Sequence, residues 1–209
     1  MPSQRSISTS HGDAAVLVNR ARTPSTTLVL GHGAGGGSVA RDLTALAELL
    51  PRHGITVVRV EQPWRLAGRR VAPAPRVLDE VFVAVVKGLR TRGPLVLGGR
   101  SAGARVACRT ARELDATGCL ALAFPLHPPG QPEKSRLAEL VSAGVPTLVV
   151  QGERDAFGRP EEFPEGIDLA VVPGADHSFS VLRSGPLTQP DAMGLLVEAV
   201  LEWVTREVA

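Results

Sequence analysis

The sequence contains few cysteines, little net charge and no long hydrophobic run, and each shortage excludes a class of protein. Cys108 and Cys119 offer neither a disulfide framework nor the spacing of a metal-binding motif. We expect both to be buried as small hydrophobic residues. The 23 basic and 21 acidic residues give a formal net charge of +2. Bulk charge therefore gives no reason to expect a nucleic acid or a membrane surface as a partner.

Hydrophobic segments are short. No uninterrupted apolar stretch approaches the roughly 20 residues that span a bilayer, and the start, MPSQRSISTS, lacks the apolar region of a secretory signal. We therefore expect a cytoplasmic protein. With 209 residues, 44% of them hydrophobic, the chain can bury one good core, and we expect a single domain over residues 1–209.

Strand and helix patterns alternate along the chain. Short apolar runs rich in valine and leucine predict strands buried on both faces, as in a parallel sheet: residues 26–31, 55–60, 94–99, 119–124, 146–151 and 168–173. Apolar residues at helical spacing predict helices within residues 43–50, 77–89, 137–141 and 192–204. The alternation predicts an α/β fold with a mostly parallel sheet of about eight strands flanked by helices.

Two segments fall outside this alternation. The pattern of residues from about 4 to 22 predicts a hairpin added at the edge of the sheet, with its turn at His11, Gly12 and Asp13. Residues 61–75, EQPWRLAGRRVAPAP, form the one long stretch that we expect to be irregular.

LVLGGRSAGARVA, residues 95–107, places one serine between glycines where a predicted strand passes into a predicted helix. Gly99, Ser101 and Gly103 form the pattern G-x-S-x-G at this turn. Such a turn strains the serine backbone and leaves no room for bulk two residues before and after it, which explains the glycines. It would project the hydroxyl above the carboxyl edge of the sheet, beside a helix N-terminus. The alternative is a glycine-rich turn with an incidental serine.

A nucleophilic serine needs a base, and the base needs a group that holds its tautomer. Asp155 follows one predicted strand and His177 follows the next, so parallel strands would bring both to the edge that carries Ser101. The order Ser, Asp, His along the chain is that of α/β-hydrolases. Glu153 and Asp176 are rival acids, and ordinary surface positions for the aspartate and the histidine are the simpler alternative.

GHGAGGG, residues 31–37, leaves the first long parallel strand at the same edge, and its backbone can approach a substrate closely. We assign the oxyanion hole to the backbone N–H groups of Ala34 and Ala102. A flexible loop or a phosphate cradle are the alternatives, although the stretch lacks the G-x-x-x-x-G-K-[ST] pattern of a nucleoside triphosphate site. His32 and His127 are candidates for the wall of the substrate pocket, His32 as a packing and hydrogen-bonding residue rather than a second base.

Five motifs together, GHGAGG, GGRSAGARVA, PLHPPGQPEK, VVQGERDAFG and GADHSF, resemble one small branch of the α/β-hydrolases. That branch holds compact predicted hydrolases of bacteria, a eukaryotic testis-expressed homologue and a subunit of a histone-acetyltransferase complex. The chain is also similar, more distantly, to dienelactone hydrolases, which typically use cysteine where this sequence has serine. The resemblance runs from about residue 25 to the end, and it implies that Ser101, Asp155 and His177 form the catalytic triad.

Residues 125–145 hold one short predicted helix, which leaves no room for the lid domain of lipases. We therefore expect a serine hydrolase that acts on small acyl esters or thioesters in an open pocket through an acyl-enzyme. The small acyl substrate is the expected partner, and neither a metal nor an organic cofactor is implied. A catalytically silent binding or scaffold protein is one alternative, because fold does not determine function. A transacylase is the other.

Arg65, Arg69 and Arg70 make residues 61–75 more basic than the whole chain. The strand before them would end at the active-site edge, two positions from the strand that carries Ser101. These arginines are therefore candidates for binding substrates that bear a carboxylate or phosphate. The alternative is a solvated basic loop.

Overall fold

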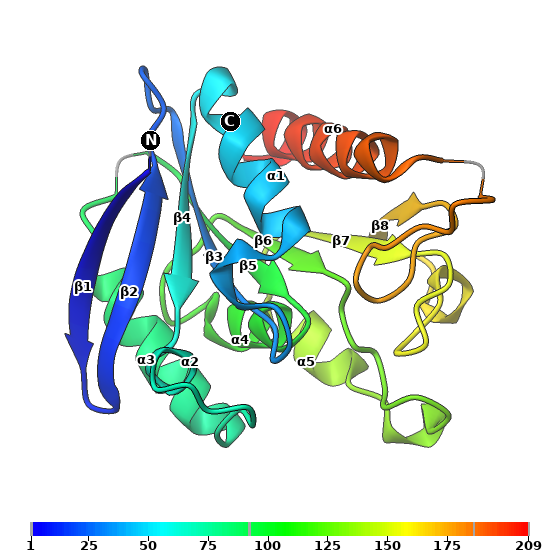
Figure 1. Ribbon diagram of the computed structural model, residues 1–209, viewed down its shortest axis with the longest axis horizontal. Coiled ribbons are helices and arrows are strands. Elements are labelled where there is room, and N and C mark those ends of the chain that lie inside the picture. Colours follow the sequence, from blue (N-terminus) through cyan, green and yellow to red (C-terminus); the bar gives the residue numbers. More distant parts are fainter. Residues whose placement is uncertain (1, 92, 186, 209) are drawn as a thin grey trace.

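The computed structural model describes residues 2–91, 93–185 and 187–208. Over these ranges the chain forms one sheet of eight strands flanked by helices (Figure 1), which confirms the predicted α/β class. The strands are β1 (Ser3–Thr9), β2 (Gly12–Asn19), β3 (Thr26–Gly31), β4 (Ile55–Glu61), β5 (Leu95–Arg100), β6 (Gly118–Leu122), β7 (Thr147–Gly152) and β8 (Asp168–Val172).

The strand order is β1-β2-β4-β3-β5-β6-β7-β8. From β4 to β8 in this order every neighbouring pair is parallel, whereas β1–β2 and β2–β4 are antiparallel. The β1–β2 hairpin forms the left edge of the sheet in Figure 1, where a hairpin was predicted. Its turn is Ser10 and His11, and Gly12 already begins β2, two residues earlier than the predicted turn at His11, Gly12 and Asp13 implied.

The helices are α1 (Arg41–Leu49), α2 (Pro63–Leu66), α3 (Pro75–Lys87), α4 (Ala102–Thr110), α5 (Leu137–Val141) and α6 (Gln189–Glu207). Four short 3₁₀ turns accompany them: η1 (Gly37–Val39), η2 (Leu50–His53), η3 (Pro132–Lys134) and η4 (Pro160–Glu162). The segment 61–75 was expected to be irregular, yet it contains α2. Pro63 begins that helix, and proline is favoured at the first helical position because its φ is already helical.

The sheet has a hydrophobic core on each face. Leu28 and Leu30 of β3 pack into the cluster that includes α1 and α6, whereas Val29 packs into the cluster that includes α3 and α4. Successive side chains of a strand point to opposite faces, and here both faces are covered. The near-continuous apolar runs of the sequence follow from this double burial. The covered sheet is a rigid platform, so the loops at its carboxyl edge are anchored at fixed positions.

The connection between β6 and β7 is short, as the sequence predicted. It contains η3 and α5, and no larger inserted unit lies between residues 123 and 146. Cys108 and Cys119 are both buried, with their sulfur atoms 3.7 Å apart between α4 and β6. In the described ranges, no helix combines the length and the apolar character required to cross a bilayer.

Candidate active site

Ser101 occupies the sharp turn between β5 and α4. Its backbone angles are φ 53° and ψ −111°, an unusual conformation for a residue with a side chain. The N–H of Ser101 donates a 2.9 Å hydrogen bond to the carbonyl of Leu122 in the neighbouring strand. Strained conformations of this kind cost on the order of 1–3 kcal/mol and persist where the surroundings hold them. The turn therefore presents the hydroxyl at the carboxyl edge of the sheet.

The glycines on either side of Ser101 are required by close backbone packing. A Cβ on Gly99 would lie 2.6 Å from both the carbonyl oxygen of Gly31 and the carbonyl carbon of Gly103. A Cβ on Gly103 would lie 2.9 Å from the carbonyl oxygen of His32 and still closer to Gly31. Since such contacts are shorter than carbon atoms tolerate, any side chain at these positions would push α4 away from β3.

The loops after β7 and β8 bring an acid and a base to Ser101. His177 Nε2 lies 3.0 Å from Ser101 Oγ, and His177 Nδ1 lies 2.8 Å from Asp155 Oδ2. The ionised Asp155 carboxylate can only accept hydrogen bonds, so Nδ1 carries the proton and Nε2 of the neutral ring is the acceptor for the serine hydroxyl. The structure thus joins Ser101, His177 and Asp155 in one chain of hydrogen bonds.

Asp155 is fully buried, and its charge is compensated by directed hydrogen bonds. Besides His177, its carboxylate accepts hydrogen bonds from Gln151 Nε2 at 2.9 Å and from the backbone N–H of Phe157 at 2.8 Å. Gln151 is itself fully buried and also donates to the carbonyl of Gly158 at 2.8 Å. These donors hold the carboxylate in one orientation beside the histidine ring.

The two rival acids are engaged elsewhere. Glu153 Oε2 accepts a 2.6 Å hydrogen bond from the N–H of Gly174. Asp176 Oδ1 accepts from the N–H groups of Ser178 and Ser180 at 2.7 and 2.9 Å, and so stabilises the turn that follows His177. Neither carboxylate is hydrogen-bonded to the histidine ring, which leaves Asp155 in that position.

Two residues at this site were not singled out from the sequence. The Phe157 ring lies against the His177 imidazole, with centroids 4.2 Å apart and planes inclined by 32°. Gln151 ends the apolar run PTLVVQ. A polar residue inside a buried strand is unusual, and this is the sequence signal that could have identified it. Both residues support the acid and the base rather than contact Ser101.

An open pocket of about 400 Å³ lies in front of Ser101. It is lined by residues 33–36, which we call the glycine loop, and by Arg100, Ser101, Phe157, His177 and Ser178. Ala34 belongs to this lining, and Ala102 is the first residue of α4, where helix N–H groups have no partner inside the helix. The two predicted oxyanion donors thus belong to the glycine loop, which lines the Ser101 pocket, and to the helix N-terminus that follows Ser101.

The profile of an alpha/beta hydrolase domain family matches residues 24–205. The chain belongs to the α/β-hydrolase family. A lidless α/β serine hydrolase from Xanthomonas campestris is 22% identical, with a TM-score of 0.72 over 97% of this chain and 94% of that one. An α/β serine hydrolase homologue from Coxiella burnetii is 20% identical, with a TM-score of 0.73 over 94% and 96% of the two chains. A dienelactone hydrolase from Anabaena variabilis is 16% identical, with a TM-score of 0.74 over 100% and 99%. At these identities the likeness of the solved structures concerns the fold.

Within this α/β-hydrolase, His32 lies behind the glycine loop. The backbone N–H of Gln62 donates to His32 Nε2 at 3.1 Å, so Nε2 is an acceptor and Nδ1 carries the proton that it donates to the carbonyl of Gly33 at 2.7 Å. Burial lowers the pKa of His32 and favours this neutral form. His32 is absent from the lining of the Ser101 pocket, so its contacts support the glycine loop.

His127 does not line the Ser101 pocket either. Its Nε2 is 2.7 Å from Glu162 Oε2, and its Nδ1 is 2.8 Å from the carbonyl of Pro128. The hydrogen bond to Pro128 raises the pKa of His127, burial opposes this effect, and Glu162 adds to the rise. The backbone N–H of His127 also donates to the carbonyl of Phe157 at 3.0 Å, which connects it to the loop that carries the acid. Among described residues, no group of three or more histidine, cysteine or acidic side chains could hold a metal ion.

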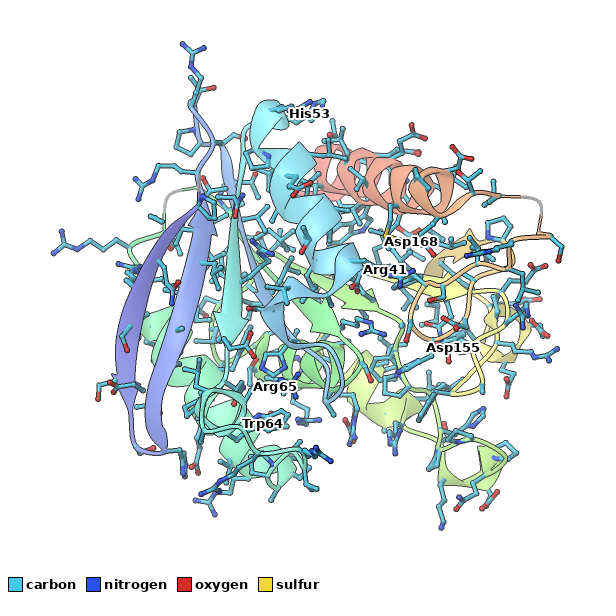
Figure 2. All side chains as sticks on the ribbon, viewed as in Figure 1. Arg41, His53, Trp64, Arg65, Asp155 and Asp168 are labelled. Atoms are coloured by element: carbon cyan, nitrogen blue, oxygen red, sulfur yellow. The ribbon has the colours of Figure 1, made fainter. Side chains whose placement is uncertain are left out.

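The three arginines predicted to face substrate do not line the Ser101 pocket. Arg65 lies beside the start of η1, with its Nε 3.6 Å from where a Cβ on Gly37 would be. Arg69 lines a separate cavity near the hairpin turn, and Arg70 is exposed. Figure 2 shows Arg65 with Trp64 at the α2 end of the molecule, well to the left of Asp155. The buried Trp64 lines the same cavity as Arg69 and as His11 of the hairpin turn, so Arg69 lies near the β1–β2 hairpin.

Proposed function

We propose that this protein is a serine hydrolase that cleaves small acyl esters or thioesters through a covalent acyl-enzyme. The chain of hydrogen bonds from Ser101 through His177 to Asp155, on a strained strand-to-helix turn, is the observation that carries the proposal. A hydroxyl with a neutral imidazole acceptor at 3.0 Å is placed for activation as a nucleophile.

The reaction begins when Ser101 Oγ attacks the substrate carbonyl carbon. His177 Nε2 takes the hydroxyl proton as the new C–O bond forms, and the Asp155 carboxylate stabilises the resulting imidazolium. The imidazolium then gives the proton to the departing alcohol or thiol, which leaves an acyl group on Ser101. A water molecule, deprotonated by His177, attacks this acyl group, and the protonated base returns the proton to Ser101 as the acid is released.

The backbone N–H groups of Ala34 and Ala102 are the proposed donors to the carbonyl oxygen. That oxygen becomes negatively charged in the tetrahedral intermediate, and fixed N–H groups stabilise the charge without reorganisation. The N-terminus of α4 adds its partial positive charge on the same side. Each well-placed donor in an oxyanion hole contributes about 2.7–4 kcal/mol to catalysis.

The open pocket and the short β6–β7 connection favour small substrates. Neither feature encloses a long acyl chain, and a lidless serine hydrolase is among the similar solved structures. The resemblance of GHGAGG, GGRSAGARVA and GADHSF to the small lidless branch of the family supports the same preference.

A substrate panel tests the proposal. The parent protein and Ser101→Ala are compared on p-nitrophenyl esters, acyl thioesters and matched anilides of short acids, with products analysed in the presence and absence of added alcohol. We expect hydrolysis of esters or thioesters by the parent and loss of turnover in the variant. Transfer to the alcohol in preference to water would identify a transacylase, and no turnover of any class would favour a binding or scaffold protein.

A further inference from the structure

The residue before the proposed nucleophile has no part in the mechanism above. Arg100 ends β5 and lines the pocket together with Ser101 and His177. Only 8% of the residue is exposed, which is little for an arginine. No acidic side chain is among the described residues that line this pocket. Among the described residues that line this pocket, the Arg100 guanidinium is therefore the one permanent charge.

Two contacts hold this guanidinium in place. Nη2 donates a 2.9 Å hydrogen bond to the backbone carbonyl of His177. On another side, Nε lies 3.5 Å from Oδ2 of Asp42, a fully buried carboxylate in the first turn of α1. Burial raises the pKa of Asp42, and the charge of Arg100 acts in the opposite direction. At 3.5 Å and without a hydrogen bond, Asp42 compensates the guanidinium only in part.

The third nitrogen, Nη1, is left without a partner. It makes no hydrogen bond with the described residues, and it is not among the side-chain atoms that the protein encloses completely. It lies next to the glycine loop, because a Cβ on Gly36 would be 3.2 Å from it. Arg100 and Gly36 both line the pocket. Nη1 therefore offers unused N–H donors at the wall formed by the glycine loop.

A fixed cationic donor in a partly desolvated pocket suits an anionic oxygen. Hydrogen bonds between a guanidinium and a carboxylate are about twice as strong as neutral ones. Because the Nη2 hydrogen bond to His177 and the ion pair with Asp42 already hold the side chain, binding costs little additional conformational entropy. A neutral ester of the same length gains none of this interaction.

We propose that Arg100 Nη1 binds a carboxylate of the substrate, so that the enzyme prefers anionic esters whose carboxylate lies within a few bonds of the scissile carbonyl. This inference rests on the proposed function. The anion-binding role predicted for Arg65, Arg69 and Arg70 is here assigned to a different arginine. Arg100 lines the same pocket as the nucleophile Ser101.

Two pairs of esters test the preference and the side on which the carboxylate lies. Ethyl butyrate and monoethyl succinate differ by a terminal methyl or carboxylate on the acyl side. Ethyl acetate and O-acetylglycolate differ in the same way on the alcohol side. At low ionic strength we expect kcat/KM to favour the anionic member of at least one pair by about ten- to hundredfold, as for one hydrogen bond to a charged group. No preference in either pair would overturn the proposal.

Matched variants assign the preference to Arg100. Gly36→Asp places a carboxylate beside Nη1, whereas Gly36→Asn has the same shape without the charge. The backbone angles at this glycine, φ −111° and ψ −16°, suit a residue with a side chain. A Cβ there would lie 3.2 Å from the Cβ of Ala40, a close contact that both variants share. We expect the ratio of anionic to neutral kcat/KM to fall about tenfold in Gly36→Asp relative to Gly36→Asn. Arg100→Met should abolish the preference, and Arg69→Ala should keep it. Equal losses on both esters in Arg100→Met, or an unchanged ratio in Gly36→Asp, would contradict the proposal.

Labelling of Ser101 by a fluorophosphonate separates this inference from the proposed function. Where turnover is slow, the rate of labelling of Ser101 measures the same preference. Succinate should slow the labelling more than the uncharged butane-1,4-diol does. A labelled enzyme without any preference for anions would remove the inference and leave the hydrolase. An unlabelled protein would remove the proposed function itself.

Discussion

Replacing Asp155 with asparagine tests how the acid acts. The carboxylate accepts from three donors, Gln151 Nε2, the Phe157 N–H and His177 Nδ1. Asparagine has one oxygen, so its NH₂ group must face at least one of these donors. With the oxygen toward Phe157, the NH₂ group donates to His177 Nδ1 and forces the ring proton onto Nε2. The ring can then no longer accept the proton of Ser101.

The expected loss is large for catalysis and smaller for stability. The wrong tautomer of a catalytic histidine lowers kcat by about 10⁴-fold, equivalent to about 5 kcal/mol. A buried donor left without an acceptor costs about 1–3 kcal/mol of unfolding free energy. For a domain of this size each kcal/mol lowers Tm by about 2–4 °C.

Ester hydrolysis and thermal unfolding are measured for Asp155→Asn beside Glu153→Gln. The second variant keeps an oxygen that can accept the hydrogen bond from Gly174, so we expect near-parent activity and Tm. A loss of activity in Asp155→Asn within about tenfold of the parent would refute the reasoning from the tautomer. Equal losses in both variants would show that the carboxylate at Asp155 has no special role.

Two further predictions concern packing and pH. Gly103→Ala should lower the free energy of unfolding by about 1–3 kcal/mol, because the added methyl group overpacks the contact with Gly31. Gly194→Ala should raise it by up to about 1 kcal/mol, because a Cβ at this position of α6 meets open space. Denaturant unfolding that ranks the two variants in the other order would contradict the packing account. The hydrogen bond to Pro128 and the Glu162 carboxylate raise the folded pKa of His127, so its pairing with Glu162 stabilises the protein below about pH 6.5 while Glu162 stays ionised, and this effect is lost as pH rises through the folded pKa of His127. Glu162→Gln should therefore lower Tm more at about pH 6 than at about pH 9, and a deficit that grows with pH would reverse the assignment.

The sequence was sufficient for the parts of the fold that depend on local pattern. Strands buried on both faces require continuous apolar runs, so β3 to β7 were recognisable from these runs. The apolar run of β8 also marked a strand, but the expected burial on both faces was wrong there, because β8 is an edge strand with Val171 exposed. Ser101 was recognisable because the turn that presents it tolerates only glycine at positions 99 and 103. The hairpin turn and the ends of most strands differ from the expectation by one or two residues, because hydrogen bonding between strands sets these limits.

Residues whose role depends on contacts between distant loops were not predictable in the same way. Glu153 and Asp155 are both plausible acids in sequence, and the hydrogen bond of Glu153 to Gly174 separates them. The basic segment after β4 was interpreted from its charge alone, whereas the structure shows Arg69 in a cavity that it shares with Trp64 and with His11 of the hairpin turn. Arg100 is one of two arginines in LVLGGRSAGARVA, and nothing in the composition distinguished it from Arg105.

Mapping a fluorophosphonate adduct by mass spectrometry tests the central claim most directly. The parent protein, Ser101→Ala and the exposed control Ser184→Ala are treated under the same conditions, and the modified peptide is sequenced. The account predicts one adduct per chain on Ser101 in the parent and in Ser184→Ala, and none in Ser101→Ala. An adduct that persists in Ser101→Ala, or a parent protein that takes up no label, would contradict it.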